Sequence, residues 1–253
     1  MVVVQRETLV VDVQCRKKKQ ILDKMERGKI IVIEGTDCSG KETQAKILYE
    51  KLRLAGIPIE KMSFPRYNTP PGRIVGGPYL GKPEICEGWF PEGATSVDSK
   101  VASLFYAADR RYALPEIREV IESGKNLLLD RYVASNMGHQ GGKVKDPEER
   151  KRLYEFLEEL EYDLLELPKP DLTVFLYMPP AVGMELKKGR VGAADQHESS
   201  LEHLKNAEQA YLELADRYSW TKIGCAPDGT VDSLKSPEKV SEEVWNLTSE
   251  FFR

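Results

Sequence analysis

The sequence predicts an α/β fold, a five-stranded parallel sheet with helices on both faces. Short, almost wholly apolar runs such as residues 30–33 and 127–130 have the composition of strands that are buried on both sides. Segments with helical periodicity alternate with these runs, and this alternation is typical of parallel sheets. With 253 residues, the chain is long enough for one such domain with a complete core.

The first apolar run leads directly into a phosphate-binding motif. Residues 29–44 read KIIVIEGTDCSGKETQ, which is a strand, a loop that begins at Gly35 and ends at Gly40-Lys41, and the start of a helix. The N–H groups of such a loop and of the helix N-terminus form a cradle for phosphate oxygens, and the lysine reaches the β- and γ-phosphates. The predicted phosphate-binding residues are Gly35, Cys38, Ser39, Gly40, Lys41, Glu42 and Thr43.

One position departs from the P-loop pattern. Glu42 stands where the pattern has a serine or threonine that holds Mg²⁺, and Thr43 comes one place later. Two outcomes follow. Either Glu42 coordinates Mg²⁺ directly or through a water, or it swings aside and Asp130 completes the metal shell with waters. We favour the first, because an unpaired carboxylate beside bound phosphates is unfavourable.

The elements before and after the motif can be assigned in order. Residues 1–24 lack a strong apolar period, so we expect an extension outside the core domain 25–253, with a docked extra strand as the alternative. A helix follows the P-loop from Ala45, and a second strand is expected at 57–64. The Pro- and Gly-rich stretch 65–94 predicts a long functional loop.

The second half of the chain continues the alternation. A helix is expected over 97–124, with a break near Pro115 and a stop at Gly124. The later helices are expected after Asp130 and over 146–162, 200–218 and 237–252, and the later strands at 127–130, 172–177 and 220–225. Residues 183–198 carry Gly183, Gly189 and Gly192 among basic residues, and we interpret them as a mobile lid.

The composition excludes several classes of protein. Charged residues make up 31% and the formal net charge is −4, which does not favour a general nucleic-acid or membrane-surface binder. No apolar run approaches the roughly 20 residues of a membrane span. The cysteines Cys15, Cys38, Cys86 and Cys225 form no Cys-x-x-Cys pair, so we expect reduced thiols in a cytoplasmic protein.

Polar residues gather where the predicted strands end. Phe64-Pro65-Arg66, Asp130-Arg131 and the basic stretch after Tyr177 all follow strands, as the P-loop does. Ligands of open parallel sheets bind beyond the carboxyl ends of the strands. An acid at the end of the strand 127–130 is where P-loop enzymes place a carboxylate for Mg²⁺, so Asp130 is the second metal candidate.

Five segments together resemble the thymidylate kinase family, whose members phosphorylate dTMP from ATP. They read EGTDCSGKETQ, SFPRYNTPPGRIV, LFYAADRRYAL, LLLDRYVASNMGHQGG and DQHE…YLELA, and the similarity covers about residues 29–252. The resemblance implies the P-loop kinase fold, direct in-line transfer with Mg²⁺, and a homodimer packed through helices, for which VASLFYAA is apolar enough.

The resemblance also implies roles for individual residues. Arg66 and Arg131 would grip the dTMP phosphate, Asp37 would face the sugar 3′-hydroxyl, and Arg110 would donate to a base carbonyl. The full set implied to bind dTMP is Asp37, Phe64, Pro65, Arg66, Tyr106, Arg110, Arg131, Asn136, His139 and Gln140. Tyr106 would lie against the thymine ring, with a core aromatic as the alternative, and His139 would crowd the 2′ position.

The catalytic set implied by the resemblance is Lys41, Asp130, Arg66 and Arg190. Family members without a P-loop arginine generally supply it from the lid, whose single arginine here is Arg190. His197 and His203 are expected to be surface residues. Two alternatives to a dTMP kinase stay open: a kinase for another (deoxy)nucleotide or nucleoside, and a nucleotide-binding protein whose catalysis has decayed.

Overall fold

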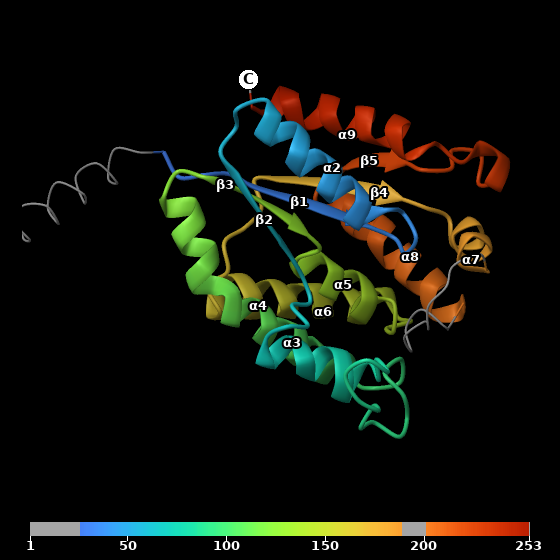
Figure 1. The fold of residues 1–253 in the computed structure, drawn as a ribbon. Helices are drawn as coiled ribbons and strands as arrows, with labels where there is room; N and C mark the ends of the chain where they lie inside the picture. Colours follow the sequence, from blue (N-terminus) through green and yellow to red (C-terminus); the bar gives the residue numbers. More distant parts are fainter. Residues whose placement is uncertain (1–25, 189–200, 253) are drawn as a thin grey trace, which may run out of the picture.

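A five-stranded sheet forms the centre of the computed structural model, which describes residues 26–188 and 201–252 (Figure 1). The strands are β1 (Ile30–Gly35), β2 (Ile59–Ser63), β3 (Asn126–Asp130), β4 (Leu172–Tyr177) and β5 (Thr221–Gly224). They lie in the order β2-β3-β1-β4-β5, and every neighbouring pair is parallel. This arrangement confirms the predicted fold class.

Helices cover both faces of the sheet. On one face, α2 (Lys41–Leu54) packs against α9 (Pro237–Phe251), above the sheet in Figure 1. On the other face lie α4 (Ser99–Glu122), α5 (Val133–Gly141), α6 (Pro147–Glu158) and α8 (Leu201–Arg217). The helix α7 (Pro180–Lys188) follows the carboxyl end of β4. Because the P-loop also follows a carboxyl end, α7 lies at the same edge of the sheet as the phosphate motif.

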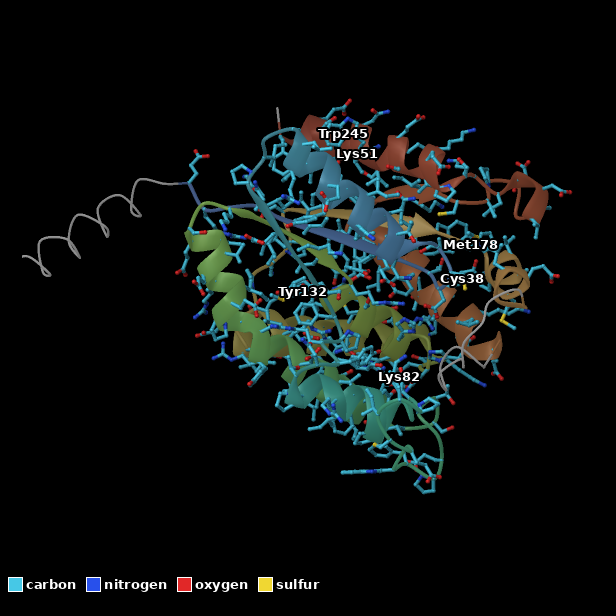
Figure 2. The ribbon with its side chains drawn as sticks, viewed as in Figure 1. Cys38, Lys51, Lys82, Tyr132, Met178 and Trp245 are labelled. Atoms are coloured by element: carbon cyan, nitrogen blue, oxygen red, sulfur yellow. The ribbon has the colours of Figure 1, made fainter. Side chains whose placement is uncertain are left out.

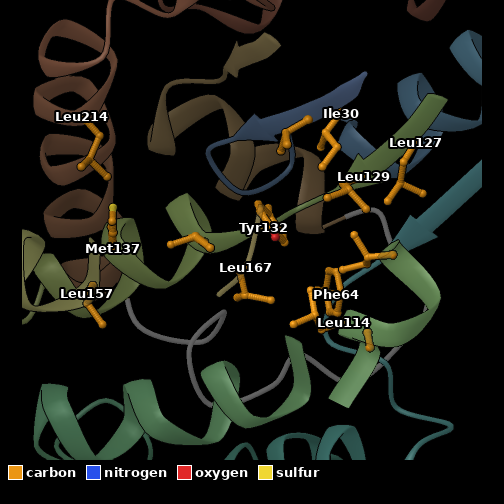
Figure 3. Close-up of a cluster of buried hydrophobic side chains, with 14 of the residues drawn as sticks. Ile30, Phe64, Leu114, Leu127, Leu129, Tyr132, Met137, Leu157, Leu167 and Leu214 are labelled. Atoms are coloured by element: carbon orange, nitrogen blue, oxygen red, sulfur yellow. The ribbon is translucent and has the colours of Figure 1, made fainter. Parts of the chain in front are cut away.

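The side chains of β1 alternate between two cores. Ile30 and Val32 join a cluster with Leu127 and Leu129 of β3 on the α4/α5 side (Figure 3). Ile31 and Ile33 instead contact the α2/α9 side, where Leu48 is buried. A strand with two buried faces accounts for the continuous apolar run in the sequence.

The predicted break near Pro115 is wrong, because α4 continues from Ser99 to Glu122 with Pro115 inside it. A proline removes one N–H from the helix ladder. Here Pro115 lies on the exposed side, whereas Leu114 and Ile117 are almost fully buried. The core contacts on both sides of the proline keep the helix intact across one missing hydrogen bond.

The stretch 65–94 contains two short helical elements that were expected to be loop. The helix α3 (Pro70–Ile74) begins after Thr69, whose Oγ1 accepts a hydrogen bond from the Gly72 N–H, and it continues into the π-helical turn η1 (Val75–Tyr79). Proline is tolerated in a first helical turn, where its missing N–H would have had no partner. Prolines here therefore begin a helix instead of excluding one.

Similar small differences occur elsewhere. The helix expected over 146–162 ends at Glu158 and continues as the π-helical turn η2 (Glu159–Leu164), and a short 3₁₀ turn, η3 (Val231–Ser233), precedes α9. Of the expected lid 183–198, residues 183–188 belong to α7, and residues 189–198 lie outside the described residues, as do residues 1–24. In the described ranges no helix has the length and apolarity needed to cross a lipid bilayer.

Candidate active site

The P-loop adopts the cradle geometry that its sequence predicts. Gly35 ends β1 so close to β4 that a Cβ would lie 2.4 Å from the Leu176 carbonyl oxygen. Cys38 and Gly40 have positive φ angles of 61° and 79°, and α2 begins at the next residue, Lys41. These turns direct the loop around the N-terminus of α2, where N–H groups and the helix dipole favour phosphate.

The side chain of Lys41 is folded back on this loop. Its ammonium is almost fully buried and donates a 2.7 Å hydrogen bond to the Thr36 carbonyl oxygen. Burial, together with the nearby Arg131 charge, lowers the pKa of Lys41 to about 8, although Asp37, Asp130 and Glu34 oppose the shift. A bound phosphate would add negative charge, which raises the pKa of Lys41 and keeps the ammonium protonated.

A cavity of about 230 Å³ opens over the P-loop. It is lined by Asp37, Cys38, Gly40, Lys41, Glu42, Thr43, Asp130 and Arg131. Most of the predicted phosphate-binding residues therefore face one space, together with both metal candidates. Gly35 and Ser39 are buried beneath it, and Cys225, after β5, places its Sγ 3.6 Å from the Ser39 carbonyl oxygen. Figure 2 shows Cys38 near Met178, at the ends of β1 and β4.

A second cavity, of about 300 Å³, adjoins the first. Eight residues predicted to bind dTMP line it: Asp37, Phe64, Pro65, Tyr106, Arg110, Arg131, Asn136 and His139. They come from the P-loop, the end of β2, α4, and the turn and helix after β3. Three residues, Asp37, Glu42 and Arg131, line both cavities. The fold therefore places two polar cavities side by side with a shared wall.

Arg131 stands at the junction of the two cavities. Its backbone has a positive φ of 66°, which is uncommon for a residue with a side chain. The guanidinium donates through Nη2 to Asp37 Oδ1 at 3.1 Å, and Nη1 lies 3.3 Å from His139 Nε2. Burial alone would lower the pKa of Arg131, but the charges of Asp37, Asp130 and Glu34 act together against it, so the net pKa is raised. Arg131 is a fixed cation between the cavities.

The groups around Arg131 have defined charge states. Burial lowers the pKa of His139 to about 3, so the imidazole is neutral at pH 7. A neutral ring can accept the Arg131 N–H at Nε2. Burial would raise the pKa of Asp37, yet the charges of Arg131 and Lys41 and the hydrogen bond from Arg131 hold it well below its usual range. Asp37 is therefore ionised and balances one of the two nearby cations.

Arg110 lines the second cavity but is already paired. Its Nη2 donates to Glu161 Oε1 at 2.6 Å, its Nε also contacts that carboxylate, and both side chains are almost fully buried. Asn136 Nδ2 donates to the same carboxylate at 2.9 Å. Glu161 thus orients two predicted base-binding residues. The remaining contact of Arg110 is long, 3.4 Å from Nη1 to the Tyr132 carbonyl oxygen.

Two residues predicted to bind dTMP do not line the second cavity. Arg66 turns its guanidinium to Glu116 on α4, with 2.7 Å between Nη1 and Oε2. Gln140 is fully buried, and its backbone carbonyl oxygen accepts a hydrogen bond from Ser99 Oγ at 3.1 Å. Arg190 lies outside the described residues. Tyr106 is half-buried and lines the cavity while packing edge-on against Tyr79 at 5.7 Å, so both of its predicted environments occur.

Two acids that position the site were missed by the sequence reasoning. Glu34 is fully buried and accepts hydrogen bonds from the Tyr132 N–H and from the N–H and Oγ of Ser135, which hold the turn after Arg131. Asp109 accepts from the Arg66 N–H at 2.8 Å. For Glu34 the signal was an acid directly after the apolar run 30–33, because a buried carboxylate needs partners.

Two expectations near the lid need correction. His203 was predicted at the surface but is 5% exposed, and its ring stacks on His139. Gly183, expected to allow motion, is buried against the P-loop: a Cβ there would lie 3.3 Å from both Asp37 O and Cys38 Cβ. Both residues face the site because α7 and α8 pack against it.

Known proteins are similar to this chain in sequence and in fold. The family model described as thymidylate kinase matches residues 33–232. The human protein named thymidylate kinase is 29% identical over 229 residues, 90% of this chain and 92% of its own. The Mycobacterium tuberculosis protein of that name is 31% identical over 220 residues, 83% of this chain and 99% of its own. A solved structure of thymidylate kinase from Candida albicans has a TM-score of 0.63 at 26% identity, and the match covers 88% of this chain and 92% of that one.

Proposed function

This chain belongs to the thymidylate kinase family, and we propose that its two adjoining cavities hold the two substrates of the family reaction. That reaction is the ATP-dependent phosphorylation of dTMP to dTDP. The P-loop cavity takes the ATP phosphates. The second cavity, with its aromatic and amide groups, takes dTMP.

The proposal rests on the wall that the two cavities share. Because Asp37, Glu42 and Arg131 line both cavities, a γ-phosphate in one and an acceptor phosphate in the other would meet at these residues. Phosphoryl transfer needs chiefly alignment and cancellation of charge. Lys41 and Arg131 supply cations on the two sides of the meeting point, and Asp37 keeps Arg131 in place.

Within the acceptor cavity, each side chain has a distinct task. Phe64 and Tyr106 offer apolar walls to a pyrimidine, and Arg110 and Asn136 present polar groups held by Glu161. Arg66 would join the phosphate clamp by leaving Glu116, a surface carboxylate whose side chain is 55% exposed. An ion pair this exposed contributes little, so the exchange for a phosphate is favourable. Arg190 is the proposed lid cation.

The donor set over the P-loop fits Mg²⁺. Asp130 and Glu42 line one cavity, and burial, with Glu42 as an added repulsive charge, raises the pKa of Asp130. Two neighbouring carboxylates that are disfavoured as a pair of bare charges suit a divalent cation, and Mg²⁺ takes one or two carboxylates along with phosphates and waters. When bound, the ion would neutralise charge on the phosphates. Asp130 and Glu42 would hold it.

Replacing Glu42 tests this metal assignment. We expect Glu42→Gln to raise the Mg²⁺ concentration for half-maximal rate about tenfold, because the exchange removes a charged hard ligand. Mg²⁺ titrations of the initial rate at saturating ATP measure the effect, with Glu50→Gln, the same exchange at an exposed position of α2, as a control for net charge. If Glu42→Ala left the Mg²⁺ dependence unchanged and tightened ATP binding, Asp130 alone would carry the metal.

Acceptor preference tests the function as a whole. In a coupled assay of ADP release with dTMP, dUMP, dGMP and thymidine, we expect dTMP to be the best acceptor. We expect dUMP to be weaker by tens-fold, since one methyl group in an apolar pocket is worth about 1–3 kcal/mol. A higher rate with thymidine than with dTMP would contradict a monophosphate acceptor. ADP release with none of the four would indicate decayed catalysis.

The remaining proposals concern the whole protein. We infer a homodimer through α4, whose Leu104 and Tyr112 are 51% and 57% exposed. We infer a core domain of residues 25–253, because Gly28 already donates to the Ile121 carbonyl oxygen and so ties the start of this range to α4. A cytoplasmic location agrees with the thiols of Cys86 and Cys225, which form no disulfide among the described residues.

A further inference from the structure

We propose that His203 is a positioning residue for the phosphoryl acceptor, because its ring holds the His139 ring in the orientation that contacts Arg131. The inference rests on the proposed function, which places dTMP in the cavity that His139 and Arg131 line. His203 itself does not line that cavity, so its effect on the acceptor would pass through His139.

The two imidazoles form a buried stack between α8 and α5. Their ring centroids lie 5.8 Å apart and the planes differ by 16°, while His203 is 5% exposed. Tyr211, two turns along the same face of α8, meets His139 edge-on at 5.7 Å and 87°. Contacts on a face and on an edge leave the His139 ring little freedom to rotate. Stacked and edge-to-face pairs of this kind are the preferred aromatic geometries.

The backbones of the two helices are packed tightly enough to make this contact rigid. A Cβ at Gly138 would lie 2.6 Å from the Tyr211 ring, and a Cβ at Gly142 would lie 2.7 Å from the Ala207 nitrogen. His203, Ala207 and Tyr211 are spaced by four residues and so share one face of α8. This face is pressed against α5 on both sides of His139.

The orientation of the His139 ring matters because His139 contacts Arg131, which in turn contacts Asp37. His139 Nε2 lies 3.3 Å from Arg131 Nη1, and Arg131 Nη2 donates to Asp37 at 3.1 Å. Hydrogen bonds weaken steeply when the donor and acceptor lose alignment. Rotation of the His139 ring would therefore release one of the two contacts that aim the planar Arg131 fork at an acceptor phosphate.

Removing the His203 ring is expected to affect one substrate selectively. His203→Ala should raise KM for dTMP about three- to tenfold, the range expected for one aromatic pair. KM for ATP should stay within about twofold, because Lys41 and the P-loop backbone do not depend on His139. His203→Phe keeps a flat ring at the same place and should restore KM for dTMP to near the wild-type value.

Two matched variants separate positioning from general destabilisation. Leu214→Val loses buried volume on the same helix, in the core cluster with Met137, and should lower Tm while leaving KM for dTMP unchanged. Lys205→Ala changes the exposed side of α8 and should alter neither. If His203→Ala does not fold well enough to assay, the ratio of KM for dTMP to KM for ATP in His203→Leu gives the same test.

The outcomes distinguish this inference from the proposed function. If the wild type phosphorylates dTMP and folded His203→Ala has the same KM for dTMP, the role of His203 is overturned and the proposed function stands. Absence of wild-type activity on dTMP would overturn the proposed function first. A rise in KM that His203→Phe does not reverse would mean that the imidazole itself, not the stacked ring, is required, and this result would also overturn the inference.

Discussion

Replacement of Lys41 by methionine is expected to lower kcat by about 10²–10³-fold, with a smaller change in KM for dTMP. Removing one preorganised donor to a developing charge typically has an effect of this size. Methionine keeps the unbranched length of the buried stem and lacks the ammonium that now donates to Thr36. Single-turnover measurements of ADP formation, alongside a thermal melt, test the prediction. A kcat within tenfold of wild type would remove Lys41 from the phosphate contacts.

We also expect the affinity for ATP to fall above pH 8, because Lys41 loses its proton there. The pKa of Lys41 is lowered to about 8, so the ammonium is protonated below pH 8 and loses its proton above it in the free protein. ATP binding favours the ammonium, so above pH 8 a proton must be taken up on binding. Kd for ATP should therefore rise as pH increases from 8 to 9.5, approaching tenfold per unit. Calorimetric titrations with wild type and Lys41→Met should show this slope in the wild type only.

Arg131→Ala is the second large effect, an expected loss of roughly 10²–10³-fold in kcat/KM for dTMP. A guanidinium offers a phosphate two parallel charge-assisted hydrogen bonds, each worth about 1.5–3 kcal/mol. The variant also leaves Asp37 without its 3.1 Å partner, so a buried carboxylate loses its nearest cation. Both changes raise KM for the acceptor, and the loss of alignment lowers kcat.

Arg131→Lys is the informative control for this prediction. Alanine and lysine both have a Cβ, so each adopts the backbone φ of +66° at a similar energetic penalty, and the two variants differ only in the aliphatic stem and the ammonium beyond Cβ. Lysine should recover only part of the lost kcat/KM, because a point charge cannot replace the planar fork. Steady-state kinetics with dTMP varied at saturating ATP measure both variants. Unchanged dTMP kinetics in Arg131→Ala would exclude the residue from the acceptor site.

Local patterns in the sequence were sufficient for the strands and the phosphate cradle. Residues 30–33 of β1 and 127–129 of β3 are buried, so these positions are apolar and each run is visible in the sequence without its partner strand. The phosphate cradle is similarly local, because its turns at Cys38 and Gly40 directly precede Lys41 at the start of α2. Where local signals misled, as at Pro115 and at the start of α3, the neighbouring core contacts or the cap decided the conformation.

The sequence by itself therefore determined the fold class, the phosphate motif and the family of this protein. Only the tertiary structure decided which way the distant side chains turn. Arg66 faces Glu116, Arg110 is held by Glu161, and His203 is buried on His139. These pairs join residues 50 to 64 positions apart, and no periodicity in the sequence indicates such a contact. The physical reason is that burial makes a polar group take whichever partner packing brings within hydrogen-bond reach.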